Sequence, residues 1–284
     1  MEDILKISKV SKNFKTFSLS DININIKENC ITGFLGKNGA GKTTLIKIIL
    51  GIIHKDEGSI IYFNNPNLGE KHIKDKIGVV LDDEYFYDKL TLDQMKNLVA
   101  SAYTNWDNEK YENYIKRFRL NGKQVISSLS KGMKMKYSLC LALSHNADLL
   151  IMDEPTSGLD PEVRKELMQV LKEYVGEEGK SVFFSTHITS DLEQSADEII
   201  IIDNGKIVEQ INKDEILEQY RIIKGDIQLL NKLNSKDIGL VNKSSYGFSA
   251  ISDKYQDIKK KFPETIIERA SLEDIFLAKT EVGQ

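Results

Sequence analysis

Hydrophobic positions along the chain form short runs separated by polar turns, the pattern of a protein in which strands and helices alternate. In the stretch 19–26, Ile22, Ile24 and Ile26 alternate with polar residues, which predicts a strand with one buried face. Other apolar runs predict strands at 4–10, 31–35, 58–63, 77–81, 148–153 and 181–185. The run 199–208 contains an Asn-Gly pair, which predicts a β-hairpin. The pattern therefore indicates an α/β fold.

Helical spacing and capping residues predict helices between these strands. Thr91 and Gln94 are typical of a capped helix start, Ser130 is a natural N-cap, and Pro161 suits the first turn of a helix. The predicted helices cover about 42–53, 91–118 (with breaks), 130–143, 161–175 and 213–220. Beyond Gly225 the pattern changes to short alternating segments. We therefore expect a main domain at 1–220 and a small C-terminal α+β domain at 221–284.

Composition narrows the class of protein. The chain has 284 residues, 40% hydrophobic and 29% charged, which is ordinary for a globular protein. Its net charge of −4 gives no support for a nucleic-acid partner, and no apolar run approaches the 18 residues of a membrane span. The N-terminus does not resemble a signal peptide. Cys30 and Cys140 lie in apolar segments, so we expect two buried free thiols in a reducing cytosol.

A glycine-rich stretch, Gly36-Lys37-Asn38-Gly39-Ala40-Gly41-Lys42-Thr43-Thr44, follows the predicted strand 31–35 and opens a helix. It fits the phosphate-loop pattern, in which glycines let backbone N–H groups turn inward onto an anion. The positive end of the helix dipole adds to this attraction. Lys42 can reach the β- and γ-phosphates, and the Thr43 hydroxyl can bind Mg²⁺. The stretch therefore predicts a nucleotide site.

Carboxylates and a histidine follow two later strands. Asp153 and Glu154 end one apolar strand, at the edge where α/β sheets bind ligands. Asp153 can hold Mg²⁺, and Glu154 can orient or deprotonate a water that attacks the γ-phosphate. His187 ends the next strand, where it could touch the same phosphate.

Two aromatic residues precede the phosphate loop by roughly twenty residues. Phe14 could belong to the core or stack on adenine, and Phe17 is a competing candidate for stacking. Five further aromatics, at 103, 106, 111, 114 and 118, predict a small local core more than a partner surface.

The order of these motifs resembles the ATP-binding subunit of a bacterial ABC transporter, over residues 1 to about 215. Gly36–Thr43 resembles the Walker A motif, and 149–154 resembles the Walker B motif with its catalytic glutamate. The signature, usually Leu-Ser-Gly-Gly-Gln, is here Leu129, Ser130, Lys131, Gly132 and Met133. The D-loop is Ser157, Gly158, Leu159 and Asp160, His187 is the switch histidine, and Phe14 falls at the adenine-stacking position.

Three features of the sequence narrow or qualify this resemblance. Lys131 and Met133 in the signature, and the C-terminal run 272–276, resemble single-domain ATPases that export drugs, lantibiotics or peptides. Asp82 stands where the family has its Q-loop glutamine, and its role is left open. The acidic run around it, which includes Asp83 and Glu84, predicts a basic segment on a membrane partner.

The resemblance implies a P-loop NTPase fold with an antiparallel β subdomain and a helical subdomain at about 85–146. It implies ATP and Mg²⁺ as cofactors, a head-to-tail homodimer or heterodimer, and integral membrane permease subunits that hold the chain at the cytoplasmic face of the membrane. The signature of each subunit would face the ATP of the other. A soluble non-transport ABC ATPase and a regulatory ATP sensor are the alternatives; long coiled coils and zinc cysteines typical of the soluble kinds are absent from this sequence.

Overall fold

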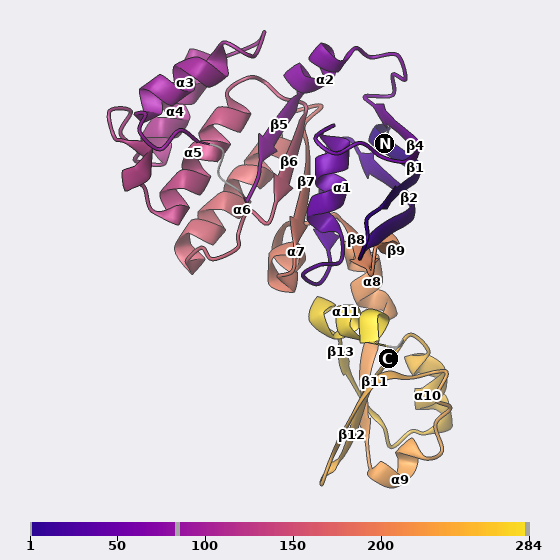
Figure 1. Cartoon of the computed structure of the whole chain (residues 1–284). Coiled ribbons are helices and arrows are strands. Elements are labelled where there is room, and N and C mark those ends of the chain that lie inside the picture. Colours follow the sequence, from indigo (N-terminus) through magenta and orange to yellow (C-terminus); the bar gives the residue numbers. More distant parts are fainter. Residues whose placement is uncertain (1, 83–85, 282–284) are drawn as a thin grey trace.

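Three β-sheets organise the part of the chain that the computed structural model describes, residues 2–82 and 86–281 (Figure 1). The strands are β1 (Asp3–Asn13), β2 (Ser18–Lys27), β3 (Ile31–Leu35), β4 (Glu57–Tyr62), β5 (Ile77–Val80), β6 (Leu149–Asp153), β7 (Ser181–Thr186), β8 (Glu198–Asp203), β9 (Lys206–Asn212), β10 (Arg221–Gly225), β11 (Gly239–Ser244), β12 (Gly247–Ser252) and β13 (Ile266–Arg269). The central sheet has the order β5-β6-β7-β3-β8-β9 and is parallel except for β9. The antiparallel sheets are β2-β1-β4 and β11-β12-β10-β13.

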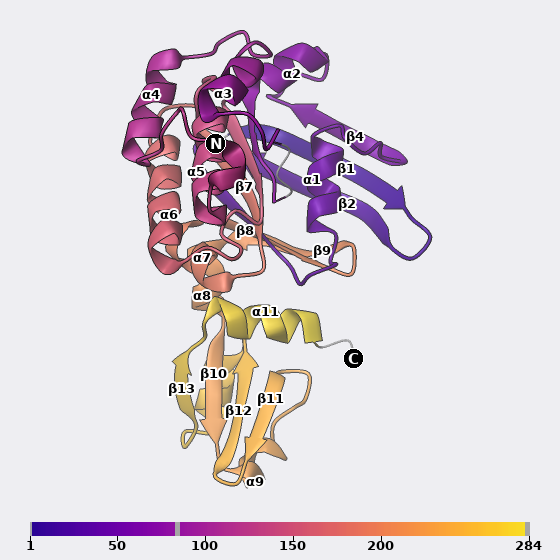
Figure 2. The same cartoon turned by 60° about the vertical axis from the view of Figure 1, so that its left-hand side comes forward.

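Helices cover both faces of the central sheet (Figures 1 and 2). They are α1 (Lys42–Ile49), α2 (Glu70–Lys76), α3 (Leu92–Ala100), α4 (Asn108–Arg117), α5 (Lys131–Leu143), α6 (Pro161–Val175), α7 (Thr189–Ser195), α8 (Lys213–Gln219), α9 (Ile227–Leu230), α10 (Tyr255–Lys261) and α11 (Leu272–Glu281), with a 3-10 turn at Ile126–Ser128. Successive side chains of a strand point to opposite faces. Phe34 of β3 accordingly packs in a hydrophobic cluster with α1 and the β2-β1-β4 sheet, whereas Leu35 packs in a second cluster with α3 to α7.

The elements agree well with those expected from the sequence, and three differences have local causes. The helix after the phosphate loop ends at Ile49 rather than near 53, because Gly51 takes a left-handed φ of 71°. The periodic stretch 91–118 forms two helices, α3 and α4. Helix α2 was not expected, because it is highly charged and buries no residue. Thr91 and Gln94 form the expected capping box.

The C-terminal part has a hydrophobic cluster of its own, around Ile223 and Phe248. Helix α11 leaves that cluster and packs against the main body, where Leu272 and Ile275 are fully buried in the same cluster as α5 to α7. The Leu272 N–H donates to the Glu193 side chain of α7 at 2.6 Å. Figure 2 shows α11 lying across the end of the C-terminal sheet, next to α8. The division at 220/221 stays a prediction.

Both cysteines are buried free thiols, as expected. Burial raises the pKa of Cys30 to about 11 and raises that of Cys140 as well. Of the expected aromatic core, Tyr111 and Phe118 are buried, and Trp106 and Tyr114 pack against the same cluster. Among the described residues, no helix combines the length and apolar character that a membrane crossing needs.

Candidate active site

The phosphate loop joins β3 to α1 at the carboxyl edge of the central sheet. Gly41 caps α1 with a φ of 110°, and a Cβ there would lie 2.6 Å from Leu19 and 2.8 Å from the Phe17 ring. Gly39 also has a left-handed φ, of 81°. Only glycine accommodates this backbone and the close approach of Phe17. The loop therefore has the tight curl that the sequence predicts for a phosphate cradle.

Lys42, in the first turn of α1, is only 5% exposed, and its Nζ lies inside the loop. The ammonium group donates to the Gly36 carbonyl at 2.7 Å and to the Lys37 carbonyl at 3.1 Å. It also lies 3.1 Å from Oε1 of Glu154. The loop lysine and the carboxylate expected to act as a base are thus in direct contact.

Glu154 and Asp153 are held at the end of β6 by Ser185 of the neighbouring strand β7. The Ser185 hydroxyl donates to Asp153 Oδ1 at 2.5 Å, and the Glu154 N–H donates to the Ser185 hydroxyl oxygen at 3.0 Å. Glu154 has a φ of 49°, in the left-handed region that few non-glycine residues adopt. Ser185 was not among the residues expected from the sequence. Its role depends on the β6–β7 register, in which Asp153 faces Ser185.

His187 lies next to Glu154, with its Nδ1 2.8 Å from Glu154 Oε2. An ionised carboxylate only accepts hydrogen bonds, so Nδ1 carries a proton when Glu154 is charged. Its side chain is 40% exposed, whereas that of Glu154 is 12% exposed. The structure thus brings Lys42, at the start of α1, together with Glu154 and His187, which directly follow β6 and β7.

Comparison with known proteins identifies the family of this chain. An ABC transporter family model matches residues 19–157. The chain is 36% identical over 229 residues to the bacitracin transport ATP-binding protein BcrA of Bacillus licheniformis, covering 78% of this chain and 74% of that protein. The chain belongs to the ABC transporter family. It is an ABC-type ATP-binding protein and an ATP hydrolase.

Solved structures agree with this assignment. The ATP-binding subunit of an ABC transporter superposes with a TM-score of 0.69 at 27% identity, covering 76% of this chain and 92% of that one. CbiO1 of Clostridium perfringens, described as part of the ABC transporter complex cbiONQ, superposes with a TM-score of 0.66 at 27% identity, covering 77% of this chain and 92% of that one. The fold is therefore that of an ABC ATPase cassette, as the sequence predicts.

The ABC signature stretch begins helix α5 on the face of the sheet opposite to α1. Ser130 caps α5 by accepting from the Met133 N–H at 3.2 Å, and Leu129 is buried beneath it. Met133 packs against the cluster of α3 to α7. An added Cβ on Gly132 would meet only Val163, at 3.6 Å. Ser130 itself is exposed at the start of α5.

The D-loop turn connects Glu154 to α6. Its backbone bonds run from the Ser157 N–H to the Glu154 carbonyl and from the Leu159 N–H to the Thr156 carbonyl, at 3.1 and 3.2 Å. Gly158 has a φ of 69°, and Asp160 caps α6 by accepting from the Val163 N–H at 3.0 Å. The turn is therefore ordered by its own hydrogen bonds and continues directly from the carboxylates.

Asp82 follows β5, and its Oδ1 lies 3.5 Å from Nζ of Lys131 in the signature. Both side chains are about half exposed. An added Cβ on Gly158 of the D-loop would lie 3.4 Å from the same ammonium group. Two of the departures from the usual ABC pattern thus contact each other. Asp83 and Glu84 lie outside the described residues.

Phe14 and Phe17 occupy the turn between β1 and β2. Phe14 is 45% exposed, which excludes a core role, and the Lys12 ammonium lies 5.8 Å from its ring centre. Phe17 is partly buried, with its ring against Gly41 and Gly205. Phe14 is therefore the ring with a face available for stacking, and adenine binding there stays a prediction.

Proposed function

We propose that the chain is the ATP-hydrolysing subunit of an exporter and works as a head-to-tail dimer that closes on two ATP molecules. Permease subunits in the membrane would carry the substrate, and closure and hydrolysis would drive their change of state. The 36% identity to a bacitracin transport ATP-binding protein supports a peptide or drug as the exported class. With these partners the chain would lie at the cytoplasmic face of the membrane.

The dimer is proposed because the two halves of the ATP site, the phosphate loop and the signature, lie apart within one chain. The phosphate loop follows β3 and opens α1, whose apolar residues pack on one face of the sheet. The signature begins α5, which packs on the other face, and Lys131 lies near Asp82 after β5. Strands β3 and β5 are three strand spacings apart, roughly 14 Å. The signature of one chain is therefore too far from its own phosphate loop to face the phosphate bound there. A second copy of the chain, or a related chain, most simply supplies the signature that does.

Hydrolysis at this site would use Glu154 as the general base for the attacking water and His187 as the group that holds Glu154 and contacts the γ-phosphate. Lys42 would exchange its contact with Glu154 for the β- and γ-phosphate oxygens. That exchange would free the Glu154 carboxylate for the water. Loop residues Gly36 to Thr44 would donate backbone N–H groups to the phosphates, and Ser130 and Gly132 of the other subunit would close the site.

Mg²⁺ fits the oxygen atoms available here. The Thr43 side chain is exposed at the start of α1, and Asp153 is buried and oriented by Ser185, so a hydroxyl and a carboxylate could serve as ligands. Bound there, the ion would neutralise charge that develops on the phosphates. Asp82 could add a carboxylate to this shell or to its waters.

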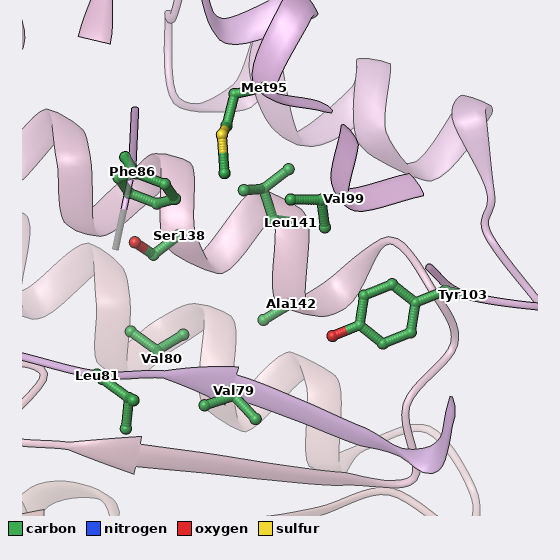
Figure 3. A pocket seen from close by; sticks show the side chains of 10 residues that line it. All are labelled: Val79, Val80, Leu81, Phe86, Met95, Val99, Tyr103, Ser138, Leu141 and Ala142. Carbon is green, nitrogen blue, oxygen red and sulfur yellow. The ribbon is translucent and has the colours of Figure 1, made fainter. Parts of the chain in front are cut away.

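Permease docking is supported by an apolar hollow between β5 and helices α3 and α5 (Figure 3). Its lining includes Val79, Phe86, Met95, Val99, Tyr103 and Leu141. Asp82 and Asp88 are exposed beside it. The partner segment would therefore combine a hydrophobic side chain that enters the hollow with basic residues at its rim.

The substitution Glu154→Gln tests the proposal, because it removes the base and keeps the shape of the side chain. ATP hydrolysis should fall by about 10² or more, the usual contribution of a general base. ATP binding should persist, and light scattering should show a dimer with ATP and a monomer without it. Wild-type turnover would remove Glu154 from this role, and an ATP-bound monomer would overturn the dimer.

A further inference from the structure

Asp191 is a buried carboxylate close to the active site that the proposed chemistry does not use. It lies in the first turn of α7, four residues after His187, and is only 3% exposed. An aspartate in the first turn of a helix is normally solvated, and a buried carboxylate is unfavourable unless it is paired. The groups that pair with the Asp191 carboxylate therefore indicate the role of this residue.

The partners of Asp191 lie at the two ends of the D-loop turn. The Thr156 hydroxyl, fully buried, donates to Asp191 Oδ2 at 2.6 Å. The Arg164 Nε lies 3.8 Å from Oδ1, and this buried Nε has no hydrogen-bond partner in the described part of the chain. Thr156 comes just before Ser157, and Arg164 lies in the first turn of α6, after Asp160. One carboxylate thus contacts both flanks of the turn.

Helix α7 is itself fixed to the central sheet on its other side. Leu192 is fully buried, and its side chain occupies the space that a Cβ on Gly33 of β3 would need, at 2.1 Å. Asp191 therefore projects from a helix that is seated on the strand preceding the phosphate loop. Through α7, the D-loop turn is tied to the same support as the phosphate loop and His187.

The electrostatic surroundings agree with this placement. Burial raises the pKa of Asp191, while the Thr156 hydrogen bond and the Arg164 charge lower it. The charges of Glu154 and His187 also act on it, in opposite directions. Asp191 is thus electrostatically coupled to the two proposed catalytic groups without touching either.

We infer that Asp191 is a positioning residue for ATP hydrolysis: it locks the D-loop turn, through Thr156 and Arg164, to the helix that follows His187, so that Glu154, His187 and the D-loop keep one geometry. The inference rests on the roles proposed above for Glu154 and His187. The D-loop is thereby coupled to the histidine by a fixed contact inside one subunit.

Three substitutions in the full chain test this inference through steady-state ATP hydrolysis. Asp191→Asn keeps the shape and the Thr156 contact and removes the charge opposite Arg164; kcat should fall about five- to twentyfold with KM for ATP within twofold. Thr156→Val should have an equal or larger effect, and Thr156→Ser, which restores the hydroxyl, should recover activity to within about twofold. Because the residues act as one unit, the double variant should be little worse than Thr156→Val alone.

Ser195→Ala is the matched control. The Ser195 hydroxyl donates to the Asp191 carbonyl at 2.5 Å within α7, so this variant removes a buried hydrogen bond from the same helix and leaves Thr156 and Arg164 intact. Its kcat should be unchanged when each variant is assayed at the same interval below its own Tm. Losses in Asp191→Asn and Thr156→Val no larger than in this control would overturn the inference, as would a rise in KM at constant kcat.

A substitute variant and a dimerisation assay complete the test of the positioning role. If Asp191→Asn does not fold, Arg164→Gln, which changes a partly exposed side chain, should show the same loss of kcat. In the Glu154→Gln background, Asp191→Asn should leave ATP-dependent dimerisation unchanged. A failed Glu154→Gln test would count against the proposed function, whereas unchanged hydrolysis in Asp191→Asn counts against the positioning role alone.

Discussion

Asp82 and Lys131 carry opposite charges at two positions where ABC proteins usually have glutamine and glycine. Their ion pair is half exposed, and such pairs contribute roughly 0–1 kcal/mol to stability. Its effect is therefore local: the lysine offsets the negative charge of Asp82 just after β5. The ammonium group also lies close to Gly158, so the pair connects the end of β5, the signature and the D-loop.

The substitution Asp82→Asn separates a structural from an electrostatic role for this carboxylate. We expect the free energy of unfolding to change by less than about 1 kcal/mol, because the pair is exposed. Asp82 follows β5 at the carboxyl edge of the sheet, where ATP is proposed to bind, so removal of its negative charge should tighten ATP binding about twofold at low salt and less at high salt. Fluorescent-nucleotide titration at two salt concentrations measures this, with the exposed Asp88→Asn as control. Weaker binding would instead indicate that Asp82 helps to hold Mg²⁺.

The sequence was sufficient to predict the approach of Glu154 and His187, because both follow buried strands whose carboxyl ends meet at one edge of a parallel sheet. It was not sufficient for Ser185 or Asp191. Ser185 acts through the register of β6 on β7, and Asp191 acts through the packing of α7 on Gly33. Strand register and helix packing both depend on residues far apart in the chain, so the sequence around Ser185 or Asp191 does not indicate either role.

Among the elements, α7 has a central position between the sheet and α11. Its Leu192 packs on Gly33 of β3, and its Glu193 accepts a hydrogen bond from the first residue of α11. The alternating pattern of 221–284 predicts a separate α+β unit, and it gives no indication that the last helix returns to the main core. That return depends on the burial of Leu272 and Ile275, whose partners lie far away in the sequence.

The substitution Gly33→Ala should displace α7. The added methyl group would lie 2.1 Å from a Leu192 methyl carbon in a fully buried site, and overpacking of this kind costs about 1–3 kcal/mol. We expect that loss in the free energy of unfolding, measured by urea denaturation, together with a lower kcat because α7 follows His187. Gly69→Ala is the control, since its Cβ would make only an ordinary 3.7 Å contact with His72. An unchanged kcat would show that hydrolysis tolerates a shift of α7.

For the whole molecule, the decisive feature is that the helices opened by the phosphate loop and by the signature pack on opposite faces of one sheet. Sheet order could not be read from the sequence, because the strands that neighbour β3 come from residues 181–186 and 198–203. The resemblance to ABC proteins supplied the expectation of a shared site, and the order β5-β6-β7-β3 gives that expectation a physical basis.

Mixed dimers test the shared site directly. Lys42→Ala disables the phosphate loop of its own subunit. Gly132→Asp places a negative charge in the signature, at a position where the added Cβ makes only an ordinary 3.6 Å contact with Val163. Each variant alone should hydrolyse ATP at about 1% of the wild-type rate or less, by the loss of transition-state charge stabilisation. A mixture should regain activity, because mixed dimers contain one site with an intact loop and an intact signature. No recovery after mixing would argue against sites shared between subunits.

The two buried thiols have a practical consequence for following subunit closure. The thiolate is the form that reacts with maleimides, and burial keeps both Cys30 and Cys140 protonated and shielded at pH 7 to 8. A cysteine introduced at an exposed position such as Ser127 would react far faster than either. Donor and acceptor dyes could then be attached to the otherwise unaltered chain, and the distance between subunits could be recorded during each ATP turnover.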